Sequence, residues 1–184
     1  MTGLYGGAFD PPHRGHVELA RSAKEQLGLD RLVVLVAAHP GHKPVETPPE
    51  PRLALARAAF PEDEVILDEH ARTIDTLRAH PEWDGAVFLL GADQFVDFPA
   101  WTEPEQVLDR VRLAVATRPG FPEDRLQAVL AQLARPERVS FFEIEPVPLA
   151  SSELRERLER GEDVGSDVPS AVAEIIRRDR LYAG

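Results

Sequence analysis

The sequence predicts an α/β fold in which a doubly wound parallel sheet forms one domain. Apolar runs of β type alternate with helical patterns almost throughout, which indicates βαβ units and a parallel sheet. The 184 residues suffice for one packed domain, residues 1–184, and neither an internal repeat nor a low-complexity linker divides them. We therefore expect a Rossmann-like, single-domain fold with a C-terminal helical segment.

The N-terminal elements are the clearest. A short apolar run at residues 2–5 predicts the first strand, and a helical pattern follows at residues 16–27, which Gly28 closes as a C-terminal cap. The run RLVVLVA at residues 31–37 is continuous rather than alternating, so it predicts a strand buried on both faces. The proline-rich stretch at residues 40–51 is too short for a domain boundary, and we expect a loop over a ligand site.

The middle of the chain continues the alternation of strands and helices. Residues 52–59 are helical in pattern, residues 64–67 form a short β-type run, and residues 73–80 are helical again. The run AVFLL at residues 86–90 predicts another buried strand, and a short helical stretch surrounds residues 103–110. These elements extend the series of βαβ units.

The C-terminal part adds two strands, at residues 112–117 and 139–144, and three helices, at residues 125–134, 151–160 and 169–178. In an open parallel sheet, ligands bind outside the carboxyl ends of the strands, where the strand order reverses. We therefore expect the loops after the first strand, after Ala37 and after Leu90 to converge on one site.

Composition restricts the class of protein. A formal charge of −11 argues against a nucleic-acid partner, because proteins that bind nucleic acids present basic patches. The absence of cysteine excludes disulfides, thiolate catalysis and cysteine-based zinc sites. No apolar run approaches the ~20 residues of a membrane span, and no signal-peptide pattern opens the chain. These features predict a cytoplasmic protein without a membrane partner.

The segment GGAFDPPHRGH at residues 6–16 is the strongest functional signal. Glycines after a strand let the backbone approach a ligand, and the helix start that follows offers unpaired N–H groups and a positive dipole end. His13 and His16 lie on one side of that turn and can donate to phosphate oxygens, while Gly15 keeps the approach open. The order of strand, glycine turn and helix start predicts a nucleotide-phosphate site, although either half alone also fits a rigid turn.

Other polar residues follow the predicted strands. His42 and Lys43 lie after the strand at residues 31–37, where they fit either a second phosphate or a solvated loop. Thr73 fits the N-cap of the next helix, and Thr76 follows within the first turn.

The C-terminal half holds the remaining candidates. Gly91 and Asp93 end a buried strand, and Asp93 suits a ribose hydroxyl or a helix N-cap equally well. Trp101 suits the core or stacking on an aromatic ring, and Arg118 is a candidate anion contact. A later helix start carries hydroxyls that serve as caps or phosphate donors and an arginine suited to a bidentate phosphate clamp: Ser151, Ser152 and Arg155.

Together these residues resemble the nucleotidyltransferases with an HxGH motif. The Pro-Pro form of the segment at residues 6–16 is similar to that of the bacterial nicotinate-mononucleotide adenylyltransferases, and the similarity continues through FLLGAD, FPAW, RPG and LASSELR to the C-terminus. The chain departs from the family pattern at Ala8, Arg72, Thr102 and Ala150. Arg72 stands where the family has tyrosine, and Thr102 where it often has an aromatic residue.

The resemblance implies transfer of the adenylyl group of ATP to nicotinate mononucleotide, which gives deamido-NAD and pyrophosphate, with His13 and His16 as catalytic residues. It implies ATP contacts from Gly6, Gly7, Ala8, Phe9, His13, His16, Gly91, Asp93, Ser151, Ser152 and Arg155. It implies acceptor contacts from His42, Lys43, Thr76, Trp101, Thr102 and Arg118. Mg²⁺ is expected to be bound mainly through the ATP phosphates, so no protein metal ligands are expected.

Other functions stay open from the sequence. The acceptor could be nicotinamide mononucleotide, or phosphopantetheine as in a sister family with related motifs. The chain could also be a nucleotide-sensing module without turnover, which the intact His13, His16 and Arg155 disfavour. The sequence leaves open the oligomeric state and the degree of preference for the acid over the amide acceptor.

Overall fold

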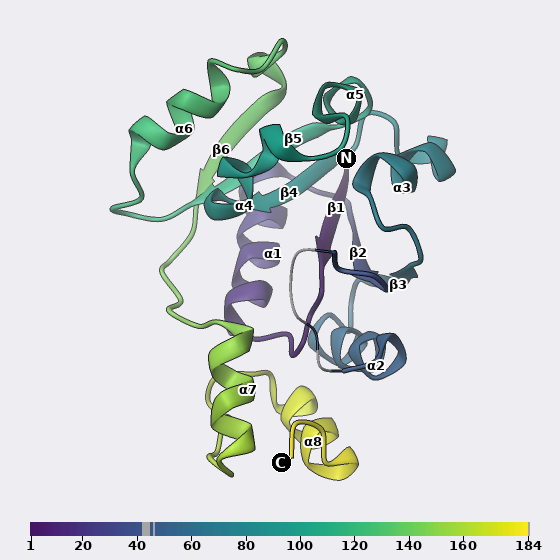
Figure 1. Ribbon diagram of the computed structural model, residues 1–184, viewed down its shortest axis with the longest axis vertical. Coiled ribbons are helices and arrows are strands. Elements are labelled where there is room, and N and C mark those ends of the chain that lie inside the picture. The colour runs from purple at the N-terminus through teal and green to yellow at the C-terminus, as the bar shows by residue number, and fades with distance from the viewer. Residues whose placement is uncertain (42–44, 46, 184) are drawn as a thin grey trace.

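A six-stranded parallel sheet forms the centre of the computed structural model, which describes residues 1–41, 45 and 47–183 (Figure 1). Its order is β3-β2-β1-β4-β5-β6, so the chain moves from β1 to one edge, returns beside β1 with β4 and continues to the other edge. This order confirms the doubly wound fold. The strands are β1 (Thr2–Gly7), β2 (Arg31–Ala37), β3 (Glu64–Asp68), β4 (Val87–Gly91), β5 (Arg112–Thr117) and β6 (Val139–Glu143).

Helices connect the strands and cover the sheet (Figure 1). The helices are α1 (Arg14–Leu27), α2 (Pro49–Ala59), α3 (Thr73–Ala79), α4 (Ala92–Val96), α5 (Pro104–Arg110), α6 (Glu123–Leu130), α7 (Ser151–Glu159) and α8 (Ser170–Asp179). Short 3₁₀ turns lie at Pro81–Trp83, Phe98–Ala100 and Pro136–Arg138. None of the helices in the described part of the chain is long and apolar enough to span a membrane.

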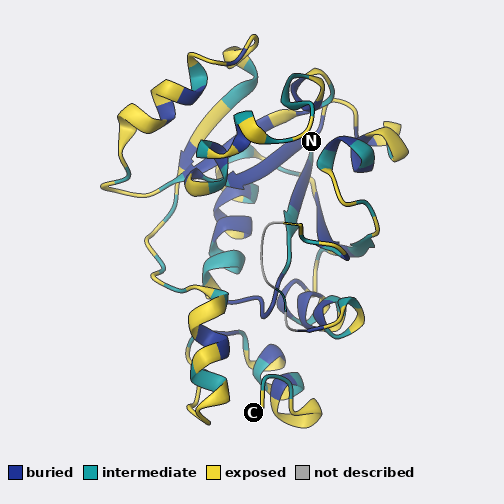
Figure 2. Cartoon of the chain, in the orientation of Figure 1, coloured by how far each residue is buried: buried dark blue, intermediate teal, exposed yellow. Residues whose placement is uncertain are grey.

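Each face of the sheet has its own hydrophobic core, because successive strand residues point to opposite faces. In β2, Val34 and Val36 belong to the core that α1, α2, α7 and α8 cover, whereas Val33 and Leu35 belong to the core that α3, α4, α5 and α6 cover. Figure 2 shows the sheet as the buried centre between the two layers. The continuous apolar runs of the sequence therefore correspond to strands covered on both faces.

The structure contains every strand and helix that the sequence predicts, with the ends of most of them shifted. Two differences concern the site. β1 continues through Gly6 and Gly7, so these glycines are strand residues and the turn follows them. α1 begins at Arg14 rather than at His16, because His13 caps it. The five-residue helix α4 was not predicted.

A gap between β1 and β4 creates the expected binding edge. β1 pairs with β2 along its whole length, from Thr2 to Gly7, but with β4 only from Gly3 to Tyr5. Beyond Tyr5 the two central strands therefore separate at their carboxyl ends. This separation is the crevice at which ligands bind in doubly wound sheets.

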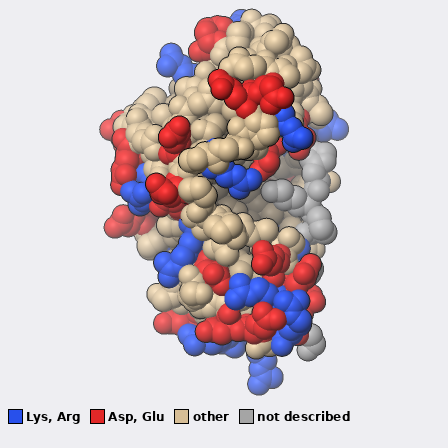
Figure 3. Space-filling view, turned by 90° about the vertical axis from the view of Figure 1, so that its left-hand side faces the viewer, with Lys and Arg blue, Asp and Glu red and all other residues tan. Residues whose placement is uncertain are grey.

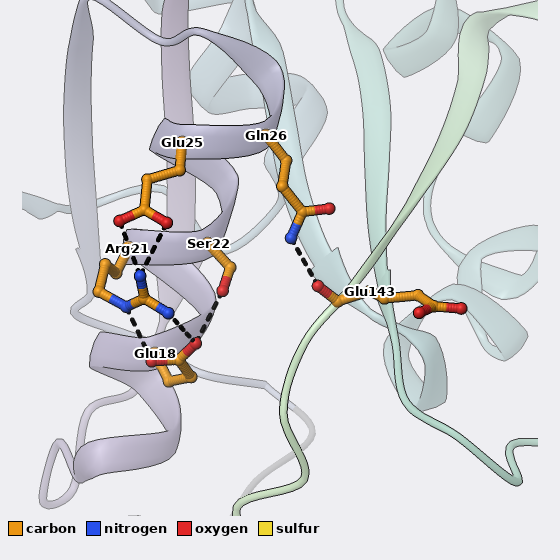
Figure 4. Close-up of polar contacts among 6 residues, drawn as sticks. All are labelled: Glu18, Arg21, Ser22, Glu25, Gln26 and Glu143. Carbon is orange, nitrogen blue, oxygen red and sulfur yellow. Dashed lines mark hydrogen bonds and ion pairs between the residues drawn. The ribbon is translucent and has the colours of Figure 1, made fainter.

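Side-chain contacts fix α1 against the end of β6 (Figure 4). Gln26 donates from Nε2 to the backbone carbonyl of Glu143 at 2.7 Å. On the exposed surface of α1, Arg21 bridges Glu18 and Glu25, a local arrangement that contributes little stability in water. The position of α1 therefore depends mainly on its buried face and on this link to β6.

The C-terminal segment forms the lower end of the molecule (Figure 1). Acidic and basic side chains intermingle there, as Figure 3 shows. Arg157 of α7, for example, pairs with Asp167 at 2.9 Å and with Glu162 at 3.3 Å. Residues before α8 also reach the start of α1, because Arg14 donates its backbone N–H to the carbonyl of Asp167 at 2.9 Å.

Candidate active site

The loop between β1 and α1, residues 8–13, is anchored in the core by Phe9. This residue has a φ of 51° and a side chain that is only 1% exposed. Its ring meets Tyr5 and His16 edge-on, with centroids 5.5 and 5.2 Å away. A Cβ on Gly7 would lie 2.9 Å from the Phe9 ring, so this position requires glycine. The Phe9 side chain belongs to the core, which leaves its backbone for the predicted ATP contact.

His13 and His16 cap the first turn of α1 with their own rings. Nδ1 of His13 accepts a hydrogen bond from the N–H of Gly15, and Nδ1 of His16 accepts one from the N–H of His13, each at 3.1 Å. A ring nitrogen that accepts carries no proton, so each neutral imidazole carries its proton on Nε2. The ring centroids are 3.9 Å apart. The backbone therefore orients two Nε2–H donors side by side at a helix N-terminus.

Gly15 has a steric role between the two histidines. A Cβ at this position would lie 3.0 Å from both Cε1 and Nδ1 of His13. The His13 ring would then have to shift by a few tenths of an ångström from its place over the first turn of α1. The glycine of the HxGH motif therefore makes room for the capping ring.

The start of α7 packs against the residue 8–13 loop. Ser151 donates from its hydroxyl to the carbonyl of Pro11 at 3.0 Å, and Arg155 donates to the carbonyl of Asp10 at 2.9 Å. Arg155 is 6% exposed and also lies 3.9 Å from the Asp10 carboxylate. Ala150 is the N-cap, so the capping role considered for the serines is not observed. Ser152 is exposed at the same helix start. The structure thus brings Ser151 and Arg155 to the loop that carries His13.

A cavity lies at the carboxyl edge of the sheet, where the loops after β1, β2 and β4 converge as predicted. Its lining includes Gly6, Gly7, Ala8, Phe88, Leu90 and Trp101. Sequence reasoning missed the contribution of β3: Asp68, at the end of this strand, and His70 also line the cavity. The edge position of β3 in the sheet could have indicated them.

Thr76 points its hydroxyl at Asp68 in this cavity. The hydroxyl lies 2.7 Å from Asp68 Oδ2, and the Thr76 side chain is buried. His70 contacts the other oxygen of Asp68 through Nδ1 at 3.0 Å. The expected contact of Thr76 with an acceptor stays a prediction, and Thr76 would have to release Asp68 in order to donate. Thr73 does not cap α3, because Arg72 is the N-cap residue.

Trp101 forms part of the wall between two cavities. Its ring meets Phe88 and Phe98 edge-on, with centroids 6.2 and 5.3 Å away. It is partly exposed and lines both the cavity described above and a second cavity that includes Thr102. Trp101 is therefore held by the core on one side and accessible to a ligand on the other.

Asp93 and Arg118 meet at the ends of β4 and β5. Arg118 lies 3.7 Å from the Asp93 carboxylate, and both side chains are exposed. Asp93 is not the N-cap of α4: Gly91 holds that position, and its N–H donates to Gln94 Oε1 at 3.3 Å. The capping interpretation of Asp93 was therefore wrong, and its carboxylate faces solvent at the sheet edge.

The proline-rich loop is described only in part. The predicted acceptor residues His42 and Lys43 lie outside the described residues. The neighbouring His39, Pro40 and Gly41 line the cavity, so the loop reaches the site as expected.

Arg52 supports the loops of the site from α2, a role that the helical pattern of residues 52–59 did not reveal. Its side chain is fully buried, and burial lowers the pKa of its guanidinium. The guanidinium donates to four backbone carbonyls, those of Ala8, Ala37, Ala38 and Thr47. It therefore joins the loop after β1 to both ends of the loop after β2.

Comparison with known proteins agrees with this geometry. The family model described as cytidylyltransferase-like matches residues 4–157. A probable nicotinate-nucleotide adenylyltransferase of Bordetella avium is 38% identical, over 98% of this chain and 96% of that protein. The chain belongs to the nicotinate-nucleotide adenylyltransferase family. Relatives of the same name from Thermomicrobium roseum and Thermus thermophilus are 36% and 35% identical, and each alignment covers 98% of this chain and at least 90% of the relative.

Solved structures extend the likeness of this adenylyltransferase family member to the fold. A Plasmodium falciparum nicotinic acid mononucleotide adenylyltransferase complexed with NaAD superposes with a TM-score of 0.73. The match covers 98% of this chain and 96% of that chain at 20% sequence identity. The same protein complexed with APC gives a TM-score of 0.70. These matches confirm the Rossmann-like fold.

Proposed function

We propose that this protein transfers the adenylyl group of ATP to nicotinate mononucleotide, with deamido-NAD and pyrophosphate as products. The observation that carries the proposal is the pair of imidazoles that cap α1, with two Nε2–H donors at the helix N-terminus that follows β1. Family membership supports the reaction, since the relatives are named for it. We also propose that the reaction takes place in the cytoplasm, because the chain contains no cysteine.

The chain contributes position and charge rather than a covalent intermediate. A phosphate oxygen of the mononucleotide attacks the α-phosphorus of ATP, the bond from that phosphorus to the bridging oxygen breaks, and pyrophosphate leaves. His13 and His16 donate to the reacting phosphate, where preorganised donors stabilise the charge of the transition state. Gly6, Gly7 and Ala8 let the nucleotide approach the backbone of the sheet edge.

Other residues bind the remaining parts of ATP. Ser151, Ser152 and Arg155 bind the leaving phosphates at the start of α7. The backbone near Gly91 and the carboxylate of Asp93 accept hydrogen bonds from the ribose hydroxyls. In support, Ser151 and Arg155 lie against the residue 8–13 loop, and Asp93 is exposed at the sheet edge.

The acceptor binds on the Trp101 side of the crevice. The pyridine ring stacks on Trp101, whose ring is fixed by Phe88 and Phe98. The backbone of Thr102 and the side chain of Thr76 lie around this ring, and Arg118 contacts a phosphate. His42 and Lys43 complete the acceptor site.

Mg²⁺ enters this site with ATP, and the donor set fits that role. The described residues contain no cluster of three metal-ligating side chains, whereas the donors around the residue 8–13 loop suit phosphate oxygens. Mg²⁺ keeps several waters and commonly binds through substrate phosphates, whose charge it neutralises. The histidines and Arg155 therefore bind the phosphates themselves.

The decisive experiment measures pyrophosphate release with ATP, Mg²⁺ and each acceptor in turn. We expect kcat/KM for nicotinate mononucleotide to exceed that for nicotinamide mononucleotide by about tenfold or more, because a site of hydrogen-bond donors leaves the amide NH₂ mismatched. Phosphopantetheine should give no pyrophosphate. Nucleotide binding without pyrophosphate release from any acceptor would instead indicate a sensing module, and equal values for the two mononucleotides would indicate dual specificity.

A further inference from the structure

We propose that Arg72 determines the acceptor preference by binding the carboxylate of the nicotinate ring. This inference rests on the proposed function. Arg72 is the residue at which the chain departs from the tyrosine of its family, and it lies at the N-cap position of α3. At this position the change from tyrosine to arginine introduces a positive charge that can bind a carboxylate.

The first argument is location. Two cavities at the carboxyl edge share a wall that consists of Ala71, Arg72, Thr73, Gln94 and Trp101. A pyridine ring that stacks on Trp101 lies against this wall. Within residues 1–41, 45 and 47–183, Arg72 is the only lysine or arginine in the lining of either cavity. Among the described residues, Arg72 is therefore the cationic side chain that an acidic group on the ring would meet at this wall.

The second argument is the state of the arginine. Among the described residues, no hydrogen bond or ion pair holds the Arg72 side chain, which is exposed. Arg78 on the same helix is instead engaged by Glu103 at 2.8 Å and by Asp75 at 3.4 Å. The pKa of Glu103 is lowered chiefly by the hydrogen bond from Arg78, and the charge of Arg72 adds only a smaller effect. The nearby acidic side chains thus pair with Arg78, and the guanidinium of Arg72 is available to donate to a ligand.

Two carboxylates in the cavity linings, Asp68 and Asp97, affect where a ligand carboxylate can bind. Asp68 lines the first cavity, but it accepts hydrogen bonds from the backbone N–H of His70 and from Thr76, which offset its charge. Asp97 lines the second cavity together with Thr102. A ligand carboxylate is therefore directed toward Arg72, where the guanidinium offers a planar pair of donors. An amide cannot use both donors, because its NH₂ group does not accept.

The test compares kcat/KM for nicotinate and nicotinamide mononucleotides in wild type, Arg72→Gln, Arg72→Lys and the matched control Arg78→Gln. We expect Arg72→Gln to lower the acid-to-amide ratio by about tenfold or more, the factor that a charge-assisted hydrogen bond supplies. The loss should appear in KM for the acid, with a smaller change in KM for the amide. Arg72→Lys should retain part of the ratio, and Arg78→Gln all of it.

Salt provides a second readout, because it screens an exposed cation. In wild type, KM for the nicotinate form should rise with ionic strength more steeply than in Arg72→Gln. An unchanged acid-to-amide ratio in Arg72→Gln, with both mononucleotides still reacting, would overturn the inference. Failure of the wild type to release pyrophosphate with either mononucleotide would overturn the proposed function itself. The two outcomes are distinguishable, because the first requires pyrophosphate release and the second is its absence.

Discussion

At the scale of the residue, the two histidines show how a short motif determines a protonation pattern. In His13 and His16 the backbone uses Nδ1 as a helix cap, so the proton of each neutral ring stays on Nε2. A helix cap usually comes from serine, threonine, aspartate or asparagine. Under the proposed function the same rings also donate to the ligand, so the start of α1 and the proposed catalytic geometry depend on the same two residues.

Replacing either histidine by alanine should therefore reduce turnover. We expect His16→Ala, and to a lesser degree His13→Ala, to lower kcat by about 10² or more, which is the usual cost of removing one preorganised donor. The control is His80→Ala, which removes a ring that stacks on Trp83 in the 3₁₀ turn after α3 and takes no part in the cap of α1. Wild-type kcat in a folded double variant of His13 and His16 would contradict the proposed site.

Gly15 allows activity to be separated from helix stability. Alanine favours a helix interior over glycine by roughly 0.5–1 kcal/mol, so Gly15→Ala should not unfold α1. Its Cβ would lie 3.0 Å from the His13 ring, so kcat should fall. In a His13→Ala background the same substitution should have almost no further effect, because the displaced ring is gone. Additive losses in this double-mutant cycle would show that Gly15 acts by another route.

The sequence singled out these residues but did not predict their contacts, and their chemical role stays a prediction. His13, His16 and Gly15 were found from their spacing, yet their capping bonds were missed because capping patterns are recognised by hydroxyl and carboxylate residues. Local pattern also gave Thr73 and Asp93 capping roles that Arg72 and Gly91 hold instead. A cap depends on the φ and ψ angles of one residue, which tertiary packing decides.

At the scale of the element, Arg52 joins loops that the sheet alone leaves separate. Its Nε donates to the Thr47 carbonyl at 2.9 Å, and one terminal nitrogen donates to Ala8 and Ala37 at 2.8 Å each. The planar guanidinium thus satisfies acceptors from two loops that line the cavity. Helix α2 holds these loops at a fixed separation, although it lies beneath the site rather than in it.

Arg52→Lys should destabilise the protein despite conserving the charge. An ammonium cannot reproduce the planar fork of donors, and each buried carbonyl left without a partner costs about 1–3 kcal/mol. We expect a lower midpoint of urea unfolding and a higher KM for both substrates. Arg57→Lys on the exposed side of α2 is the control and should change neither. Equal midpoints for the two variants would remove Arg52 from this role.

Secondary structure was predictable where periodicity was strong. The strands at Arg31–Ala37 and Arg112–Thr117 have the predicted limits, because both are continuous apolar runs that begin at an arginine. α4 was missed because five residues between a strand and Pro99 are too few to show a helical period. The full burial of Arg52 could not be predicted, because an arginine in a helical pattern ordinarily faces solvent.

At the scale of the whole molecule, the C-terminal segment holds the residue 8–13 loop. Tyr182 donates from its hydroxyl to Asp10 Oδ1 at 2.7 Å, and Arg155 binds the Asp10 carbonyl. Burial keeps the pKa of Tyr182 well above its usual value, so it stays a donor. These contacts join residues 172 and 145 positions apart, and no local pattern in the sequence could have predicted them.

Tyr182→Phe should loosen the residue 8–13 loop. The change removes only the hydroxyl, and a hydrogen bond to a charged group contributes about 1.5–3 kcal/mol. We expect a lower free energy of unfolding together with a lower kcat. The comparison is Ile176→Val, which removes a buried methylene of α8 without touching Asp10 and should reduce stability alone. If the two variants lose kcat equally, Tyr182 has only a structural role.

The short contact between β1 and β4 has a consequence for the order of assembly. β1 pairs with β2 through six residue pairs but with β4 through only three. In the β1–β4 pair, Gly3 is paired with Val87, which lies nearly half the chain later in the sequence. The sheet half of β1, β2 and β3 uses only residues 2–68, so a growing chain can form it before β4 leaves the ribosome. The second half then joins along the narrow ladder. Because α7 and Tyr182 come last, the nascent protein has the residue 8–13 loop long before it has the contacts that hold this loop in place.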